Sequence, residues 1–535
     1  MPRIKLNARR GSLAPLARLA SMSELQNAYV RPVLGSTRKN FMLAIFCFAE
    51  FMDAFIASAL FPAINQMNTS LHLATNESTW IFAAYSATFA AFLLISGRVA
   101  DIYGSKWCFL VGSALVGIFS LGCGFCHNKI ALFVLRAMSG IGAAMTVPSG
   151  LSLIIEWFPD PVEQNRGIAF FGGSSAIGNV FGIIIGGFCV QWASWRWIFW
   201  ATTCMGVPIA LVTIPLVPPG APRPNKPSFK RLDLGGVSLI TGAIILFIFA
   251  VTSGSATGWG KPKVIAPLII SILMGAAFFV YEAWLDPHMA ALPPRVWFYP
   301  NVPILAALGL IPFFWWLALF YSFMPLFESS YHWSPVITSV HILPTGTFSA
   351  LVAGVSSKLV EYVNPKWSIL GGLTLDIIAT FLLPFANSKE RYWSYVFPAF
   401  TIGTIGNMVL YTNANIAIFM NTPPEIAGIV GAVFNCALQG SIALGIAIIA
   451  SIASSENAKQ IAKGREPGYK GIADGFWFIL AFLLVEAIAL LIFYRIPKAG
   501  AADEEKGGAV SSSASSVTGV GTEVPEKEGS AVGAH

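Results

Sequence analysis

Charged residues are scarce in this sequence. Lys, Arg, Asp and Glu together make up 11% of its 535 residues, whereas 55% of the residues are hydrophobic. A soluble domain carries about 25% charged residues, because water must hydrate its surface. A protein core alone cannot hide this much apolar surface. The composition therefore excludes an ordinary soluble fold and predicts an all-α membrane protein, with lipid as the solvent for most of its surface.

Motifs of enzymes and ATP-driven pumps are missing as well. No G-x-x-x-x-G-K-[ST] motif occurs, and the nearest stretch, GWGKPK from Gly258, fails the pattern. The six histidines are dispersed, without a pair at metal-ligand spacing. The net charge of +7 is spread between apolar segments, unlike the basic face of a nucleic-acid-binding domain. We therefore expect no enzymatic activity, no cofactor, no metal and no nucleic-acid partner.

The seven cysteines do not form a disulfide framework. All of them fall within or beside apolar segments. Cys123 and Cys126 have the spacing of a redox pair, but the sequence around them has no thioredoxin-like βαβ pattern. We interpret them as two small residues near the end of a helix.

Long apolar runs dominate the chain instead. A spanning helix needs about 20 mostly apolar residues, and fourteen segments meet this requirement. They cover roughly residues 41–65, 79–97, 107–126, 130–155, 168–190, 195–217, 235–253, 264–284, 301–327, 335–355, 367–386, 392–420, 426–453 and 474–495.

Polar stretches divide these segments into larger parts. We expect a disordered cytoplasmic N-terminus over residues 1–39 and six-helix bundles over 40–217 and 291–497. Residues 218–290 are expected to hold a linker and two extra transmembrane helices, and 498–535 a disordered cytoplasmic tail. The basic N-terminus lacks the apolar core of a signal peptide, so the first apolar segment is expected to be an uncleaved anchor.

The basic residues predict the orientation. With the N-terminus in the cytoplasm, more than twice as many lysines and arginines fall in cytoplasmic as in outside loops, as the positive-inside rule requires. The outside loop 454–473 does not follow this rule, because it contains Lys459, Lys463, Arg465 and Lys470. Two glycosylation sequons, at Asn68 and Asn76, lie in the first outside loop, with a chance match as the alternative. We expect a multi-pass, monomeric protein of the plasma membrane or the vacuolar membrane.

A weak internal repeat connects the two predicted bundles. GRVADIYGSKW begins at Gly97 and GVSSKLVEYVNPKW begins at Gly354. Each stretch starts at a glycine on a helix end and finishes in Lys-Trp, at Lys106 and at Lys366. This similarity predicts two six-helix halves with two helices inserted between them.

Ionisable residues inside the apolar segments are candidates for function, because a charge in hydrocarbon is costly without a partner or water. Glu50 and Asp53 share one face of the first segment, and Arg136 lies in the fourth. We predict that Asp53 and Arg136 form a pair of opposite charges in a water-filled cleft, where Asp53 exchanges a proton. A static ion pair is the alternative. For Asp376 and Glu486, a polar seam between helices is the simpler explanation.

Two further patterns concern packing. Gly178, Gly182, Gly186 and Gly187 share one face of the fifth segment, which permits close helix approach along a seam that slides or rocks. The aromatic run Phe313, Phe314, Trp315 and Trp316 in the ninth segment is able to line a hydrophobic site, but we expect it to face lipid.

Several motifs together resemble one family. GRVADIYGSK, with Gly97, Arg98, Asp101, Gly104 and Lys106, resembles the signature loop of the major facilitator superfamily. LRAMSGIGAA resembles the fourth-helix signature, with Arg136 as its arginine, and GNVFGIIIGG resembles the fifth-helix antiporter signature, with Ile183 in place of a proline. DAFIASALFP, SWRWIFW and LDLGGVSLITG are similar to motifs of the fourteen-helix drug:proton antiporters. Within that group, the chain is most similar to fungal transporters of the aminotriazole and boron resistance type.

The resemblance implies a major facilitator fold of two six-helix bundles plus two inserted helices, working by alternating access. It assigns proton coupling to Asp53 and Arg136, with Glu50 beside them. It also assigns Asp101 to a cytoplasmic gate, where its charge meets a helix N-terminus of the other half. The isoleucine at position 183 leaves the direction of transport open.

We therefore predict a secondary active transporter that exports a small organic compound in exchange for protons. A proton-coupled importer of a small polar solute or ion, such as ammonium, is the first alternative. A nutrient sensor that binds without transporting is the second, although its usual long signalling tail is absent from this sequence. The sequence does not identify the substrate.

Overall fold

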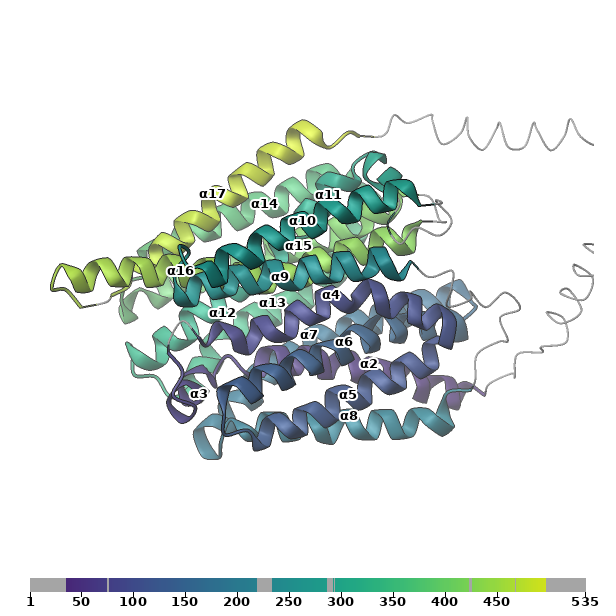
Figure 1. The fold of residues 1–535 in the computed structure, drawn as a ribbon, viewed down its shortest axis with the longest axis horizontal. Coiled ribbons are helices and arrows are strands. Elements are labelled where there is room, and N and C mark those ends of the chain that lie inside the picture. The colour runs from purple at the N-terminus through teal and green to yellow at the C-terminus, as the bar shows by residue number, and fades with distance from the viewer. Residues whose placement is uncertain are drawn as a thin grey trace, which may run out of the picture. The chain divides into compact units, whose positions relative to one another are not determined.

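The computed structural model describes residues 35–74, 77–218, 233–285, 292, 294–422, 426–466 and 468–496. Every regular element within these ranges is helical, and Figure 1 shows the long helices running side by side. The α-helices are α2 (Ser36–Ala59), α3 (Ile64–Ser70), α4 (Thr79–Tyr103), α5 (Ser105–Phe125), α6 (Lys129–Trp157), α7 (Pro161–Trp192), α8 (Arg196–Leu216), α9 (Leu234–Thr257), α10 (Pro262–Trp284), α11 (Val302–Leu308), α12 (Ile311–Ser329), α13 (Pro335–Tyr362), α14 (Pro365–Leu382), α15 (Phe397–Met420), α16 (Ala427–Ala462) and α17 (Lys470–Phe493). Short 3-10 helices, η2 (Pro294–Phe298), η3 (Leu383–Phe385) and η4 (Lys389–Arg391), and a π-helical turn, η5 (Tyr392–Val396), complete the set.

The long helices begin and end at residues with clear local causes. The side chains of Asn128, Asp160, Ser334 and Asn364 cap α6, α7, α13 and α14 by accepting hydrogen bonds from backbone N–H groups of the first turn. A proline follows three of these caps directly, where its missing N–H costs nothing. The predicted segment 301–327 is two helices in the structure, α11 and α12, separated at Gly309–Leu310.

The helices form two groups with the same packing pattern. In the N-terminal group (α2–α8), α5 packs on α6 and α8, α4 packs on α6, and α2 packs on α7. In the C-terminal group (α11–α17), α14 packs on α15 and α17, α13 packs on α15, and α12 packs on α16. Each contact in one group thus has a counterpart in the other.

Four helices carry the main contacts between the groups, since α4 packs on α16 and α7 packs on α13. The α9–α10 hairpin covers the α4–α16 side, where α9 contacts both helices. The Thr241 hydroxyl of α9 donates a hydrogen bond to the Ala91 carbonyl of α4 (3.0 Å). Just after α9, Trp259 donates its indole N–H to Ser451 of α16 (2.8 Å). The inserted hairpin therefore bridges the two groups.

Twelve stretches of the described helices are long and apolar enough to cross a membrane. In α4 only the shorter stretch Thr79–Leu93 has this character. Helix α15 is 24 residues long but contains three asparagines, Asn407, Asn413 and Asn415, and is not among the twelve. The count of fourteen spans thus stays a prediction.

Matched glycine contacts relate the two groups residue by residue. At the α5–α6 crossing, a Cβ on Gly142 would lie 2.8 Å from the Gly112 carbonyl oxygen. At the α14–α15 crossing, a Cβ on Gly406 would lie 2.6 Å from the Gly372 carbonyl oxygen. Gly112 and Gly372 each lie six residues after the lysine of a Lys-Trp pair. The structure therefore supports the register of the predicted repeat.

The two lysines of the repeat occupy equivalent places. Lys106 Nζ donates a hydrogen bond to the Ile214 carbonyl near the end of α8 (2.9 Å). Lys366 Nζ donates to the carbonyls of Leu491 and Tyr494 at the end of α17 (3.0 and 2.9 Å). Each lysine satisfies carbonyl groups that the end of a helix leaves unpaired.

The connection after the second apolar segment is shorter than predicted. We expected the helix to end at Gly97, but α4 continues to Tyr103 and only Gly104 separates it from α5. No residue between Gly97 and Tyr103 breaks a helix, whereas Gly104 adopts φ +92°, a conformation that glycine tolerates best. The charged stretch is therefore mostly helical.

Candidate functional site

The candidate site lies inside the N-terminal group, where three helices bring Asp53, Tyr85 and Arg136 together. The Tyr85 hydroxyl of α4 donates a hydrogen bond to Asp53 Oδ1 of α2. The guanidinium carbon of Arg136 on α6 lies 4.4 Å from the centroid of the Tyr85 ring, within the range of a cation–π interaction. Arg136 is 1% exposed and donates its Nε–H to the Ile81 carbonyl (3.0 Å).

In this geometry Asp53 and Arg136 lie near each other without the direct contact of a static ion pair, the alternative interpretation of the sequence. Both side chains are described, and they are not among the ion pairs within 4.0 Å. Tyr85 connects them instead, with its hydroxyl on the acid and its ring under the cation. Because Arg136 stays charged at any physiological pH, the Asp53 carboxylate has a fixed positive charge nearby. Protonation of Asp53 would therefore change the balance of charge in this network.

Glu50 lies one helical turn before Asp53 and faces the other group of helices. Its neighbours are Ser175 of α7 and Tyr411 of α15. Glu50 Oε2 is buried and has no hydrogen-bond partner. The site therefore holds two carboxyl groups and one guanidinium, with Glu50 at the boundary between the groups of helices.

Behind the acids, the predicted glycine seam packs α7 against α2. Cβ atoms on Gly178 and Gly186 would collide with the carbonyl oxygens of Phe51 and Ala59. Gly187 faces across to α13, where a Cβ would collide with the Ser339 hydroxyl. Gly182 also packs on α2, at Phe55 and Ser58. The seam therefore brings α7 close to the helix that carries both acids.

The aromatic run of α12 does not face lipid as expected. Phe314 and Trp315 are 5% and 0% exposed, and the Trp315 indole donates a hydrogen bond to the Thr380 hydroxyl (2.8 Å). Phe313 stacks on Tyr411 at 6.1 Å between ring centroids. Trp316 packs on Phe320. The expectation was wrong because Gly403 of α15 leaves room beside the Trp315 ring, a complementarity between distant segments.

The two groups are joined at the end of the bundle where α3 lies, which we call the α3 end. There Asn65 donates a hydrogen bond to Glu328 (2.9 Å), and the Val336 N–H donates to Gln191 (3.2 Å). The other end, with Gly104, differs along α7 and α13. Gly172 and Gly173 of α7 and Gly354 of α13 have no atom within 4 Å of a built Cβ. The α7–α13 pair is therefore in contact at the α3 end, whereas these three glycines nearer the Gly104 end touch no neighbouring helix.

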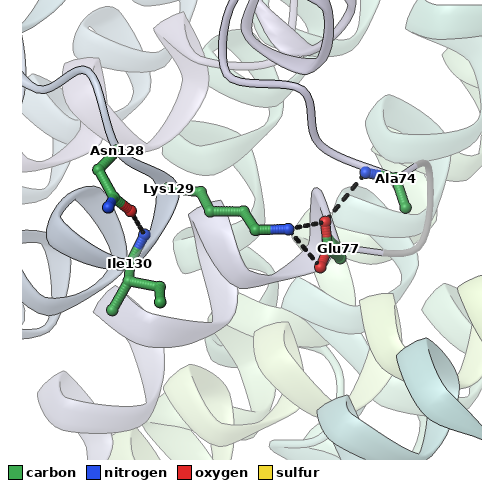
Figure 2. A network of polar contacts seen from close by, with 5 residues as sticks. All are labelled: Ala74, Glu77, Asn128, Lys129 and Ile130. Carbon is green, nitrogen blue, oxygen red and sulfur yellow. Dashed lines mark hydrogen bonds and ion pairs between the residues drawn. The ribbon is translucent and has the colours of Figure 1, made fainter.

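Short polar contacts fasten the loops at the α3 end. Lys129, at the start of α6, points its Nζ toward both carboxylate oxygens of Glu77 (Figure 2). Both N–O distances are 2.7 Å. The Ala74 N–H donates to the same carboxylate (3.0 Å). The hydrogen bond from Lys129 is the main cause of a lowered pKa of Glu77. These contacts tie the residues before α4 to α6.

The structure partly explains the basic residues of the outside loop 454–473, which does not follow the positive-inside rule. Its helices extend beyond the predicted segments, α16 to Ala462 and α17 from Lys470. Lys470 Nζ lies 2.6 Å from Glu456 Oε1, and Lys459 Nζ lies 3.7 Å from Glu456 Oε2. Two of its four basic residues are thus paired with one acid.

Some predicted residues lie outside the described part of the structure. This applies to Asn76 and to the side chains of Arg98 and Asp101, so the glycosylation of Asn76 and the gating role of Asp101 stay predictions. Asn68 lies in α3 and is half-buried, with its side-chain oxygen enclosed. Gly97 lies within α4.

Sequence reasoning missed Tyr85, the residue that connects the site. A tyrosine in an apolar segment is ordinary, so composition gives no signal for it. The missed signal is the need for a partner, because Asp53 and Arg136 lie on helices that pack on each other, and α4 packs on the helix of Arg136. Ser175 and Tyr411 were missed for the same reason, since their role depends on contacts between distant segments.

Comparison with known families agrees with this architecture. The model of the Major Facilitator Superfamily matches residues 46–446, which is most of the chain. The chain belongs to the Major Facilitator Superfamily. Proteins of this family are transporters, and the described spans make this chain a multi-pass membrane protein.

Relatives in sequence include transporters with different printed functions. A major facilitator superfamily multidrug transporter of Aspergillus fumigatus is 24% identical over 474 residues, covering 86% of this chain and 88% of the relative. A puromycin resistance protein of Streptomyces alboniger is 27% identical, covering 86% and 91%. A low affinity ammonium transporter of Saccharomyces cerevisiae is 27% identical, covering 80% and 85%.

Solved structures of the family share the fold. A D-xylose-proton symporter superposes with a TM-score of 0.61 at 12% identity, covering 85% of this chain and 97% of that one. A POT family transporter in complex with 5-aminolevulinic acid gives a TM-score of 0.62 at 16% identity, covering 84% and 96%. These similarities confirm the all-α major facilitator fold.

Proposed function

We propose that this transporter exports a small organic compound in exchange for protons, by alternating access. The observation that carries the proposal is the network of Asp53, Tyr85 and Arg136 inside the N-terminal group. A buried arginine and a membrane carboxylate are costly and are retained where they serve function. The multidrug and puromycin relatives support export of an organic compound.

The network supplies a way to couple a proton to movement. With Asp53 ionised, its charge is stabilised by the Tyr85 hydroxyl and by the nearby Arg136. When Asp53 accepts a proton, that attraction is lost and the contact between α2, α4 and α6 weakens. The Asp53 carboxyl therefore favours one arrangement of helices when it is charged and another when it is neutral. A carrier with two states needs such a difference in interaction between them.

We further propose that the Gly104 end faces the cytoplasm. The positive-inside distribution of lysine and arginine supports this orientation. The glycines of α7 and α13 that touch no neighbour near that end support an inward-open arrangement. We propose that α4 and α15 cross the membrane too, giving fourteen spans in two six-helix bundles with the α9–α10 hairpin between them. The plasma or vacuolar membrane is the proposed location, and a monomer is the proposed state.

The test is transport by the purified chain in liposomes with an imposed pH gradient, using puromycin and ammonium as separate probes. We expect puromycin to move against its gradient as protons move the opposite way, and Asp53→Asn to abolish this uphill movement. Tyr85→Phe keeps the ring under Arg136 and removes only the hydroxyl, so it should weaken coupling without abolishing binding. Unchanged uphill transport by Asp53→Asn would contradict the proton role of Asp53.

Import of a small polar ion is the second candidate, supported by the similarity to a yeast ammonium transporter. The same liposomes distinguish it, because ammonium would then enter together with protons while puromycin stays outside. That outcome would keep the proton network and reverse the direction of transport.

A further inference from the structure

A second acid lies deep in the C-terminal group, on α14. Asp376 is 0% exposed, and both of its carboxyl oxygens are buried without a hydrogen-bond partner. It lies at the α14–α15 crossing, where a Cβ on Gly406 would come within 2.9 Å of the Asp376 backbone nitrogen. The transport mechanism proposed above does not use this residue.

The donors beside Asp376 are already occupied. Asn407 of α15 donates its side-chain N–H to the Pro312 carbonyl (3.2 Å). Trp315 of α12 donates to the Thr380 hydroxyl, one turn after Asp376. The lysine on α14 itself, Lys366, lies ten residues earlier and bonds to the end of α17. Among the described side chains of this neighbourhood, none donates a hydrogen bond to the Asp376 carboxyl, although the backbone N–H of Asn407 lies near it.

No positive charge compensates Asp376 in the described part of the chain. The helices around α14 carry the following ionisable residues: Tyr411 on α15; Lys470, Asp474 and Glu486 on α17; His341, Lys358, Glu361 and Tyr362 on α13; and Tyr321 and Glu328 on α12. The side chain of Glu361 is not described, and none of the others bonds to Asp376. An isolated carboxylate in such surroundings is so costly that the group takes a proton instead.

The matching position of the other group shows that packing does not require an acid here. In the register set by the repeat, Asp376 corresponds to Val116 of α5. A Cβ on Gly142 would lie 2.9 Å from the Val116 backbone nitrogen, as a Cβ on Gly406 would from that of Asp376. Valine therefore fills the same place in the same kind of crossing. The helix crossing thus does not need an acid at position 376 in order to pack.

We propose that Asp376 is a second proton-binding site, which holds its proton sealed in the arrangement seen here and exchanges it in another. The carboxyl binds the proton through one oxygen, and no other group is needed. Exchange requires α12, α14 or α15 to shift, because water does not reach the group in this arrangement. The proposal rests on the proton-coupled function above, since a transporter without proton coupling would have no use for the site.

The test is infrared spectroscopy of the full chain in lipid nanodiscs at neutral pH. A protonated carboxyl has a carbonyl stretch that a carboxylate lacks, and the band shifts when its proton is replaced by deuterium. We expect Asp376→Asn and Asp376→Val to lose such a band and Asp53→Asn to keep it. In D2O the wild-type band should shift within minutes. No band assignable to Asp376, or a band unshifted after a day in D2O, would overturn the proposal.

Proton counting in liposomes separates this proposal from the proposed function. If wild type moves no protons with puromycin or ammonium, the proposed function fails, whereas the infrared band still decides whether Asp376 binds an exchangeable proton. If wild type moves protons, Asp376→Asn should lower the number exchanged per solute by one, and Asp376→Val should fold and behave alike. An unchanged ratio would mean that Asp376 is a neutral structural residue.

Discussion

The N-terminal and C-terminal groups of helices share one scaffold and differ in the charges built into it. Both have a glycine-glycine crossing, at Gly112–Gly142 and at Gly372–Gly406. Counting six residues back from Gly142 gives Arg136, and six back from Gly406 gives Phe400. Phe400 is fully buried and packs edge-on against Phe323. The same position thus carries the buried cation in one group and an aromatic ring in the other.

The acids of the two groups differ in whether a neighbouring side chain stabilises their charge. The N-terminal group places Asp53 in contact with Tyr85, near Arg136. In the C-terminal group no described side chain bonds to Asp376, whose counterpart in the repeat is valine. The repeat therefore determines how the helices pack, and the charged residues are added to that packing independently in each group. The N-terminal group holds a compensated acid and the C-terminal group an uncompensated one.

The largest expected effect comes from giving the N-terminal group the residue of its counterpart. Arg136→Phe removes the cation near Asp53, so proton-driven transport should fall at least tenfold, or about 1.4 kcal/mol, in the liposome assay. Arg196→Ala is a matched control, because Arg196 also stacks on an aromatic ring, Trp195 at 4.5 Å, but lies away from Asp53. Transport by Arg136→Phe at more than half the wild-type rate would contradict the comparison.

Adding a methyl group at the crossings tests whether the two scaffolds are equivalent. Gly142→Ala and Gly406→Ala each force a Cβ against a backbone carbonyl, and each should destabilise the protein by about 1–3 kcal/mol in thermal unfolding. Gly371→Ala, next to the α14–α15 crossing but with no atom within 4 Å, should be nearly neutral. If Gly406→Ala were as stable as Gly371→Ala, the close crossing would be disproved.

The two repeat lysines should differ slightly in their contribution to stability. Lys106→Met and Lys366→Met each remove a cation from a helix C-terminus, with an expected cost of about 0.3–1 kcal/mol. Lys366 makes two such hydrogen bonds and Lys106 makes one, so the melting temperature should fall more for Lys366→Met. The reverse order would show that the two caps are not equivalent.

The smallest effect concerns the Glu77–Lys129 pair, which joins two loops of the N-terminal group. Among the described ion pairs of the C-terminal group, none joins two loops in this way. The pKa of Glu77 is lowered in the folded protein, so the pair stabilises above the ordinary Glu pKa of about 4.3. This stability is lost as the pH falls through the lowered pKa. Glu77→Gln should cost about 0.5 kcal/mol at neutral pH and nothing in acid. A cost independent of pH would exclude this explanation.

The sequence predicted the helical class and the position of most helices, because lipid imposes long apolar segments that can be read directly. It misplaced the end of α4, because Arg98 and Asp101 were taken as loop residues although both are compatible with a helix until Gly104. It also treated segment 301–327 as one helix, although Pro312 at the start of α12 has no N–H to continue the hydrogen bonds of α11.

The site was predictable only in part. Asp53 and Arg136 were found because ionised groups in apolar segments are rare and costly. Tyr85 was not found, because its role depends on the packing of α4 on α6, which brings its hydroxyl to Asp53 of α2. The surroundings of Asp376 were not predictable either. The sequence near Asp376 is the same whether or not a side chain of another helix bonds to it.

Proton movement across liposomes that contain the purified chain, started by adding puromycin without an imposed gradient, tests the central claim most directly. We expect wild type to move protons opposite to puromycin and Asp53→Asn to move fewer protons for each puromycin molecule. Puromycin transport by wild type with no proton movement, or equal proton movement in Asp53→Asn, would contradict it.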